Sequence, residues 1–150
     1  MSNPAYDKIL TRVRETFPNS CVCWIEQVKN DELLKRYQSQ KSAIPNELQL
    51  FHGTSQKNID AIIKNGFNPA YNVRSLYGNG TYFAQDAIYS FDYMPVDSAD
   101  LSYMLLCDVL VGTPGIDCTT NNDKKPTIFA IPGRYSAFPK YIIAFHKYAK

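Results

Sequence analysis

Hydrophobic side chains recur at helical spacing in the first half of the chain. Ile9, Val13 and Phe17 are four residues apart, so they line one face of an amphipathic helix. Three further segments are predicted to be helical, and two of them lie beside residues that favour helix ends. The predicted helices are residues 4–17, residues 32–41 with Asn30 or Asp31 as N-cap, the segment between a Ser55 cap and a terminal Gly66, and residues 86–93.

Short apolar or alternating runs, which are typical of strands, dominate the second half of the chain. The predicted strands are residues 21–28, 48–54, 81–84, 102–111, 127–131 and 141–147. Residues 112–125 form the longest predicted loop. Helices and strands do not alternate strictly, so we expect an α+β fold instead of a doubly wound parallel sheet. The length of 150 residues and the lack of a linker predict a single domain over residues 1–150.

Composition argues against several classes of function. The formal net charge of +2 is too small to predict binding to nucleic acid or to an anionic membrane. The N-terminus carries Asp7 and lacks the apolar core of a signal peptide. No apolar run approaches the roughly 20 residues needed to cross a bilayer. We therefore expect a protein of the cytosol or nucleus.

The four cysteines, Cys21, Cys23, Cys107 and Cys118, are expected to be buried free thiols. Cys21 and Cys23 are two residues apart in a predicted strand and point to the same face, which is a poor spacing for a metal site. The chain has only two histidines, so we also expect no site with several histidine ligands.

Polar chemistry is concentrated where the apolar strand over residues 48–54 ends. His52 offers a ring nitrogen, Thr54 offers a hydroxyl, and Gly53 lets a ligand approach the backbone N–H and C=O. Asn58 lies six positions after His52, on the first turn of the following predicted helix, and we expect it beside the same ligand. The alternative is structural, since a lone histidine at a strand end and an asparagine on a helix surface need no ligand.

A second group of aromatic and polar residues follows Gly78 and Gly80. If residues 86–93 are helical, Ser90 and Tyr93 share one face. Tyr82 and Tyr93 can then sandwich a flat ring such as nicotinamide, and the Ser90 hydroxyl can bind its amide. The alternative is that these aromatic residues belong to the core. The glycines do not form a dinucleotide-binding loop, because the third glycine is missing and they precede a strand.

Together these residues resemble the NAD-binding core of the poly(ADP-ribose) polymerase (PARP) family. The resemblance extends from about residue 21 to residue 146. It implies an ADP-ribosyltransferase fold with split antiparallel β-sheets and flanking helices, NAD as co-substrate, and no need for a metal. It also implies that His52 contacts the adenosine ribose, and that Gly53 and Ser90 hold the nicotinamide amide. The implied NAD-binding residues are His52, Gly53, Thr54, Asn58, Tyr82, Ser90 and Tyr93.

One departure from the polymerising members of this family bears on mechanism. Their catalytic glutamate corresponds to Ile128 here, so the implied catalytic residues are His52, Tyr82 and Ile128. This pattern resembles the mono-ADP-ribosyltransferase members, because isoleucine cannot orient a ribose hydroxyl or polarise an attacking one. The resemblance implies transfer of single ADP-ribose units to a protein of unknown identity or to the chain itself. Residues 69–76 would form the donor-side lid, and residues 112–125 would flank the acceptor.

Two other functions stay open. The fold could bind NAD or ADP-ribose without transferring it, or it could act as an NAD-dependent RNA 2′-phosphotransferase. The presence of His52, Tyr82 and Ser90 disfavours a loss of activity. Only Lys57 and Arg74 are obvious basic residues near these motifs, and this scarcity disfavours the RNA reaction.

Overall fold

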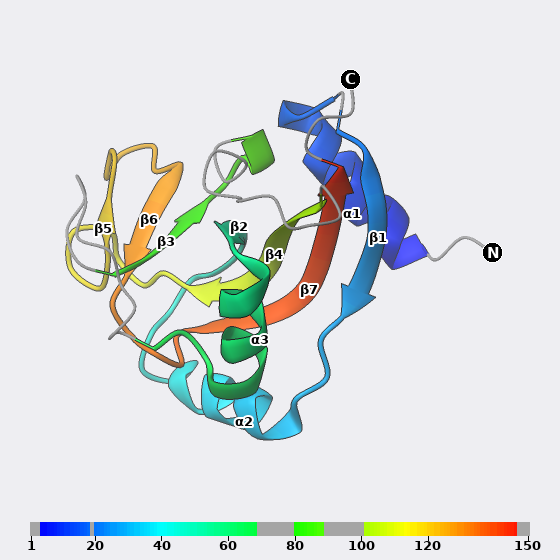
Figure 1. Cartoon of the computed structure of the whole chain (residues 1–150). Helices are drawn as coiled ribbons and strands as arrows, with labels where there is room; N and C mark the ends of the chain where they lie inside the picture. The colour runs from blue at the N-terminus through cyan, green and yellow to red at the C-terminus, as the bar shows by residue number, and fades with distance from the viewer. Residues whose placement is uncertain (1–3, 19, 69–79, 89–100, 147–150) are drawn as a thin grey trace.

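Figure 1 shows the computed structural model, which describes residues 4–18, 20–68, 80–88 and 101–146. The helices are α1 (Pro4–Thr16), α2 (Asp31–Gln40) and α3 (Gln56–Asn65). The strands are β1 (Val22–Gln27), β2 (Glu47–Thr54), β3 (Thr81–Ala84), β4 (Leu101–Leu110), β5 (Thr119–Thr120), β6 (Ile128–Ile131) and β7 (Ala137–His146). The predicted α+β class is confirmed.

One antiparallel sheet contains all seven strands, in the order β1-β7-β4-β2-β3-β6-β5. β2 pairs with β4 along its whole length, from Glu47 to Thr54. Its other neighbour, β3, is in register with it at one pair alone, Phe51 and Ala84. The expected division into two sheets is therefore not shown. The β2–β3 junction nevertheless has fewer registered pairs than any other pair of neighbouring strands in the described residues.

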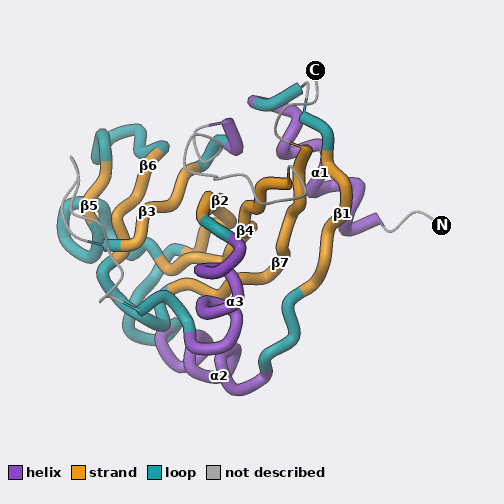
Figure 2. The backbone as a smooth tube through the Cα atoms, viewed as in Figure 1, coloured by secondary structure: helices purple, strands orange, loops and turns teal. Residues whose placement is uncertain are grey.

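Helices pack on both faces of the sheet, as Figure 2 shows for α1 and α3. Successive residues of a strand point to opposite faces, and β4 illustrates the consequence. Leu105 packs with Ile59 of α3, whereas Leu106 packs with Val13 of α1. The helix α2 closes one end of the sheet, where Leu33 and Tyr37 pack with residues of β4 and β7.

The three helices follow the predicted pattern to within one residue at each end. Asn30, not Asp31, caps α2, because its side chain accepts a hydrogen bond of 3.0 Å from the N–H of Leu33. Ser55 caps α3 in the same way, at 3.2 Å from the N–H of Asn58. Gly66 ends α3 at a φ of +83°, a conformation that favours glycine. The predicted helix over residues 86–93 lies mostly outside the described residues.

The strand β7 differs from its prediction, since it begins at Ala137 and not at residue 141. The added residues include Pro139, which has no N–H to donate to a neighbouring strand. The structure accommodates it through a shift in register, where Leu106 pairs with Tyr141 and Cys107 pairs with Pro139. The predicted loop over residues 112–125 also differs, because it contains the short strand β5.

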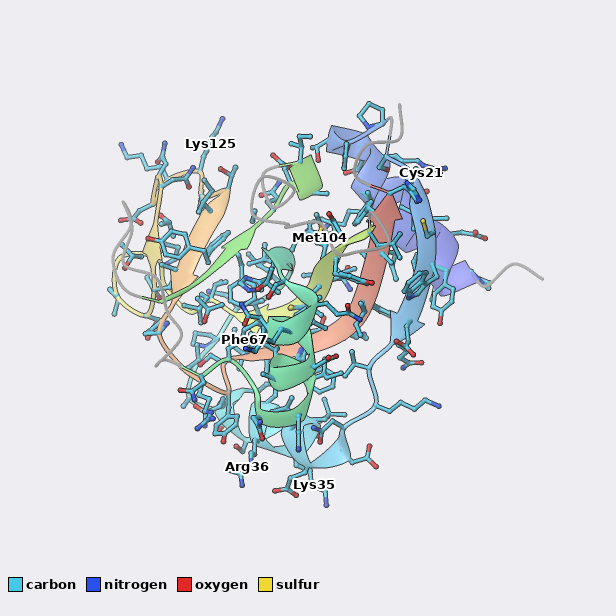
Figure 3. The ribbon with its side chains drawn as sticks, in the orientation of Figure 1. Cys21, Lys35, Arg36, Phe67, Met104 and Lys125 are labelled. Carbon is cyan, nitrogen blue, oxygen red and sulfur yellow. The ribbon has the colours of Figure 1, made fainter. Side chains whose placement is uncertain are left out.

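The prediction that all four cysteines are buried is wrong for two of them. All four are free, and Cys107 and Cys118 are buried, but Cys21 and Cys23 are exposed. Figure 3 places Cys21 at the start of β1. β1 is an edge strand with β7 as its one neighbour, and its residues are half-buried or exposed. None of the helices in the described ranges is long and apolar enough to cross a membrane.

Candidate active site

The β2–β3 junction brings His52 against the backbone of Tyr82. The pairing of Phe51 with Ala84 aligns the two strands, and Nδ1 of His52 then lies 2.6 Å from the carbonyl oxygen of Tyr82. A carbonyl oxygen only accepts hydrogen bonds, so Nδ1 carries the hydrogen and donates it. In the neutral ring this leaves the lone pair on Nε2 for another partner.

Two buried phenylalanines surround the His52 ring. The ring of Phe67 meets it edge-on at 5.4 Å between centroids, and the ring of Phe83 lies at the same distance with a tilt of 45°. Phe67 comes from the segment after α3 and lies beside that helix in Figure 3. Burial lowers the pKa of His52 below its usual value, and the hydrogen bond to the Tyr82 carbonyl partly opposes this effect. The ring is therefore held mainly neutral at pH 7.

The end of β2 and the first turn of α3 form one polar cluster. Thr54 is buried, and its Oγ1 accepts a hydrogen bond of 3.1 Å from Nδ2 of Asn58. Asn58 is exposed and Gly53 is half-buried between His52 and Thr54. The Ser55 cap fixes this turn, so the structure brings His52, Gly53, Thr54 and Asn58 together. Asn58 is exposed to solvent, but it also contacts the end of β2 through its hydrogen bond to Thr54.

Ile128 begins β6 and lies on the same face of the sheet as Tyr82. Ile128 pairs with Ala84 and Tyr82 pairs with Ala130, so Ile128 and Tyr82 are diagonal neighbours. Ile128 is 9% exposed and Tyr82 is half-buried. Gly80 lies just before β3 and close to the backbone of β6. A Cβ atom at this position would lie 3.1 Å from the backbone of Ala130, so a side chain there would crowd β6.

Asn121 was missed by the sequence analysis, although it fixes the start of β6. Its Oδ1 accepts hydrogen bonds from the N–H groups of Thr127, at 3.0 Å, and Ile128, at 3.1 Å. Its Nδ2 donates to Oγ1 of Thr127 at 2.8 Å. An asparagine six residues before a strand in a polar loop was the available signal, since asparagine side chains often bond nearby backbone. Lys125 lies beside this turn and points away from it (Figure 3).

Several predicted residues lie outside the part of the chain that the structure describes. Ser90 and Tyr93 belong to this group, as do residues 69–76 and residues 77–79. The described residues contain no cluster of three or more His, Cys, Asp or Glu side chains placed to hold a metal ion. The described geometry therefore concerns His52, Gly53, Thr54, Asn58, Tyr82 and Ile128.

Comparison with known proteins identifies the family of the chain. Residues 5–132 match the family model of the poly(ADP-ribose) polymerase catalytic domain. The chain belongs to the PARP catalytic domain family. Members of this family use NAD⁺ as co-substrate.

Several similar proteins carry mono-ADP-ribosyltransferase names. The chain is 29% identical to human "Protein mono-ADP-ribosyltransferase PARP14" across 97% of its own residues and 10% of that protein. It is 31% identical to the mouse PARP12 enzyme of the same type, over 99% of the chain and 25% of that protein. The human PARP12 protein is also 31% identical, over 96% of the chain and 24% of its own length. The chain thus spans about a tenth to a quarter of these relatives.

The position of His52 among aromatic rings makes its pKa a direct test of the site geometry. We expect a pKa below the usual value of about 6.5, because burial disfavours the charged ring. The unfolded chain then binds the proton more readily than the folded chain. The contribution of His52 to stability is therefore complete above about pH 6.5 and is lost as the pH falls through the folded-state pKa.

A proton NMR titration of the imidazole resonances measures this pKa. His52 and His146 are the only histidines, and His52→Gln assigns the two signals. Urea unfolding at a series of pH values should show a weaker loss of stability with acid in His52→Gln than in the parent. A His52 pKa at or above about 6.5 would contradict the described packing of its ring against Phe67 and Phe83.

Proposed function

We propose that this chain is an NAD-dependent mono-ADP-ribosyltransferase that modifies a protein side chain, or itself, and releases nicotinamide. The observation that carries the proposal is the hydrogen bond between His52 and the Tyr82 carbonyl at the β2–β3 junction. It orients a neutral imidazole at a strand end, in a chain of the PARP catalytic domain family. The names of the relatives support the single-unit reaction. Residues 1–150 would form one catalytic domain.

NAD would lie across the β2–β3 junction, at the place of the expected division of the sheet. The free Nε2 of His52 would meet the adenosine ribose, with Thr54 and Asn58 beside it. The backbone N–H and C=O of Gly53 would pair with the nicotinamide carboxamide. Tyr82 and Tyr93 would enclose the nicotinamide ring, and the Ser90 hydroxyl would bind the same carboxamide.

The reaction breaks the bond between the nicotinamide nitrogen and the ribose carbon. The bonding electrons leave with nicotinamide as a neutral ring, and positive charge builds on the ribose in an oxocarbenium-like transition state. A nucleophilic side chain of the acceptor then forms the new bond to the same carbon and loses its proton to solvent. The role of the protein is to hold the ribose and the ring in position for this exchange. This mechanism requires no metal.

Ile128 accounts for the proposed restriction to single units. Its side chain is buried beside Ala84 and offers no oxygen to a ribose hydroxyl. A previously attached ADP-ribose would therefore not be activated as the next acceptor. An acceptor that is a good nucleophile by itself would still react.

A binding module for NAD or ADP-ribose is the second candidate. The same apolar Ile128 favours it, because a site without a polar group there binds the ligand but does nothing for a weak acceptor. The two candidates share the residues that hold NAD. They differ in whether label from NAD becomes covalently attached to protein.

A transfer assay with His52→Ala tests the proposed function. We expect the parent to acquire label from radioactive NAD. The transfer rate of the variant should be roughly ten- to a hundredfold lower, because the variant lacks one or two hydrogen bonds that His52 makes. Lys57→Ala is the matched control, since Lys57 is exposed on the same first turn of α3 and we give it no role. Circular dichroism verifies that both variants fold.

Three results would change the proposal, from the transfer assay, from a binding titration with NAD and from an incubation with 2′-phosphorylated RNA. Equal transfer by His52→Ala and the parent would remove His52 from the site. Saturable binding of NAD by the parent without covalent label would favour the binding module. Loss of a 2′-phosphate from RNA, with no label on protein, would favour the phosphotransferase.

The substitution Ile128→Glu tests the single-unit reaction. We expect it to yield no polymer, because a carboxylate alone does not supply a site that grips a growing ADP-ribose chain. The buried position also makes a charged group costly unless it finds a polar partner. Gel electrophoresis after incubation with labelled NAD shows the product length. A ladder from the parent would contradict the mono-transferase proposal, and a ladder from the variant alone would contradict the argument about chain binding.

A further inference from the structure

The helix α1 lies against the β2–β3 junction on the face opposite His52. Ile9 and Val13 of α1 pack with Phe51 of β2 and with Ala87, which follows β3. Phe51 and His52 are successive strand residues, so their side chains point to opposite faces. Figure 1 shows α1 running behind the sheet toward the segment after β3. The junction that carries His52 on one face is thus covered by α1 on the other.

Arg12 is a residue of α1 that hydrogen-bonds to both sides of the junction. Its Nη1 donates to Oε1 of Gln49 in β2 at 3.2 Å, and its guanidinium carbon lies 4.9 Å from the centre of the Phe51 ring. Its Nη2 donates to the carbonyl oxygen of Gln85, directly after β3, at 3.4 Å. One planar group therefore links β2 to the end of β3.

A second contact between α1 and the same segment supports this arrangement. The N–H of Ile88 donates to Oγ1 of Thr16 at 3.4 Å. Gln85 is in turn joined to the start of β6, because its N–H donates to the carbonyl oxygen of Thr127 at 2.8 Å. Residues 85–88 are therefore held between α1 and β6, immediately beyond the strand that carries Tyr82.

The sparse backbone pairing at the junction gives this contact its importance. β2 and β3 are in register at Phe51 and Ala84 alone, so side-chain contacts matter more for their relative position here than along β2 and β4. Arg12 is half-buried, and its surroundings lower its pKa through burial, while Glu15 and Asp86 oppose the shift. A guanidinium holds two acceptors in one plane, which a lysine ammonium does not do.

We propose that Arg12 is a positioning residue, which sets the spacing of β2 and β3 and thereby the orientation of His52 against the Tyr82 carbonyl. The described contacts of Arg12 are with Gln49, Phe51 and Gln85, none of which is a proposed NAD-binding residue. Its effect on NAD binding rests on the proposed function, whereas its effect on the His52 ring does not.

The substitution Arg12→Met separates the guanidinium from the rest of the side chain. Methionine keeps an apolar stem over Phe51 but makes neither hydrogen bond. We expect the imidazole resonances of His52 to shift in NMR spectra. We also expect weaker binding of NAD and of benzamide, a compound with the ring and carboxamide of nicotinamide. Their dissociation constants should rise about three- to tenfold, as for the loss of one hydrogen bond between ligand and protein. Arg14→Met is the matched control, because Arg14 is an exposed arginine of the same helix. It should leave both measurements unchanged.

A role in stability alone gives a different result. If Arg12→Met melts at a lower temperature but keeps the parent His52 resonances and the parent dissociation constants, the positioning role is contradicted. If Arg12→Met does not fold, Arg12→Lys takes its place, since lysine keeps the stem and charge and reaches one of the two acceptors. It should give a smaller change in the same direction, and an unchanged His52 resonance would overturn the proposal. Failure of the parent to bind NAD or benzamide would count against the proposed function, while the His52 resonances still test Arg12.

Discussion

The single registered pair between Phe51 and Ala84 is the constraint on which the arrangement of the site depends. Four strands, β1-β7-β4-β2, lie on one side of this pair, and three, β3-β6-β5, lie on the other. Backbone ladders fix each side internally, but they contribute little across the junction. Side-chain contacts across the junction therefore carry more of the task of positioning the two parts.

Polar side-chain contacts cross the junction from opposite faces. On one face, His52 of β2 donates to the carbonyl oxygen of Tyr82 in β3. On the other face, Arg12 bonds to Gln49 of β2 and to the Gln85 carbonyl after β3. The His52 contact also leaves one ring nitrogen free for a ligand. The His52 contact thus joins the two parts of the sheet and also orients the proposed catalytic histidine.

Local sequence patterns were sufficient for the three described helices and insufficient for the edges of the sheet. The caps Asn30 and Ser55 and the terminal Gly66 act within a few residues, so the helix boundaries followed from the chain itself. Exposure of Cys21 was not predictable in this way, because it depends on β1 being an outer strand, and strand order is set by distant pairings. The start of β7 was missed for a related reason, since Pro139 is tolerated through a register shift against β4.

The candidate site divides along the same line. His52, Gly53, Thr54 and Asn58 are neighbours in sequence, and their common position followed from one strand end and one helix start. Arg12 gave no comparable signal, because Gln85 lies 73 residues away and an arginine on an amphipathic helix is usually solvated. Ser90 and Tyr93 stay predictions from sequence, and so does the role of every residue in binding NAD.

The central claim is that the β2–β3 junction binds the nicotinamide end of NAD. The most direct measurement is a titration of isotope-labelled protein with benzamide, which carries the ring and carboxamide of nicotinamide and does not react. The account predicts saturable NMR shift changes at the backbone amide of Gly53 and at the residues around Tyr82, with α2 unaffected. Saturable binding that leaves Gly53 and β3 unchanged, or no binding at millimolar benzamide, would contradict it.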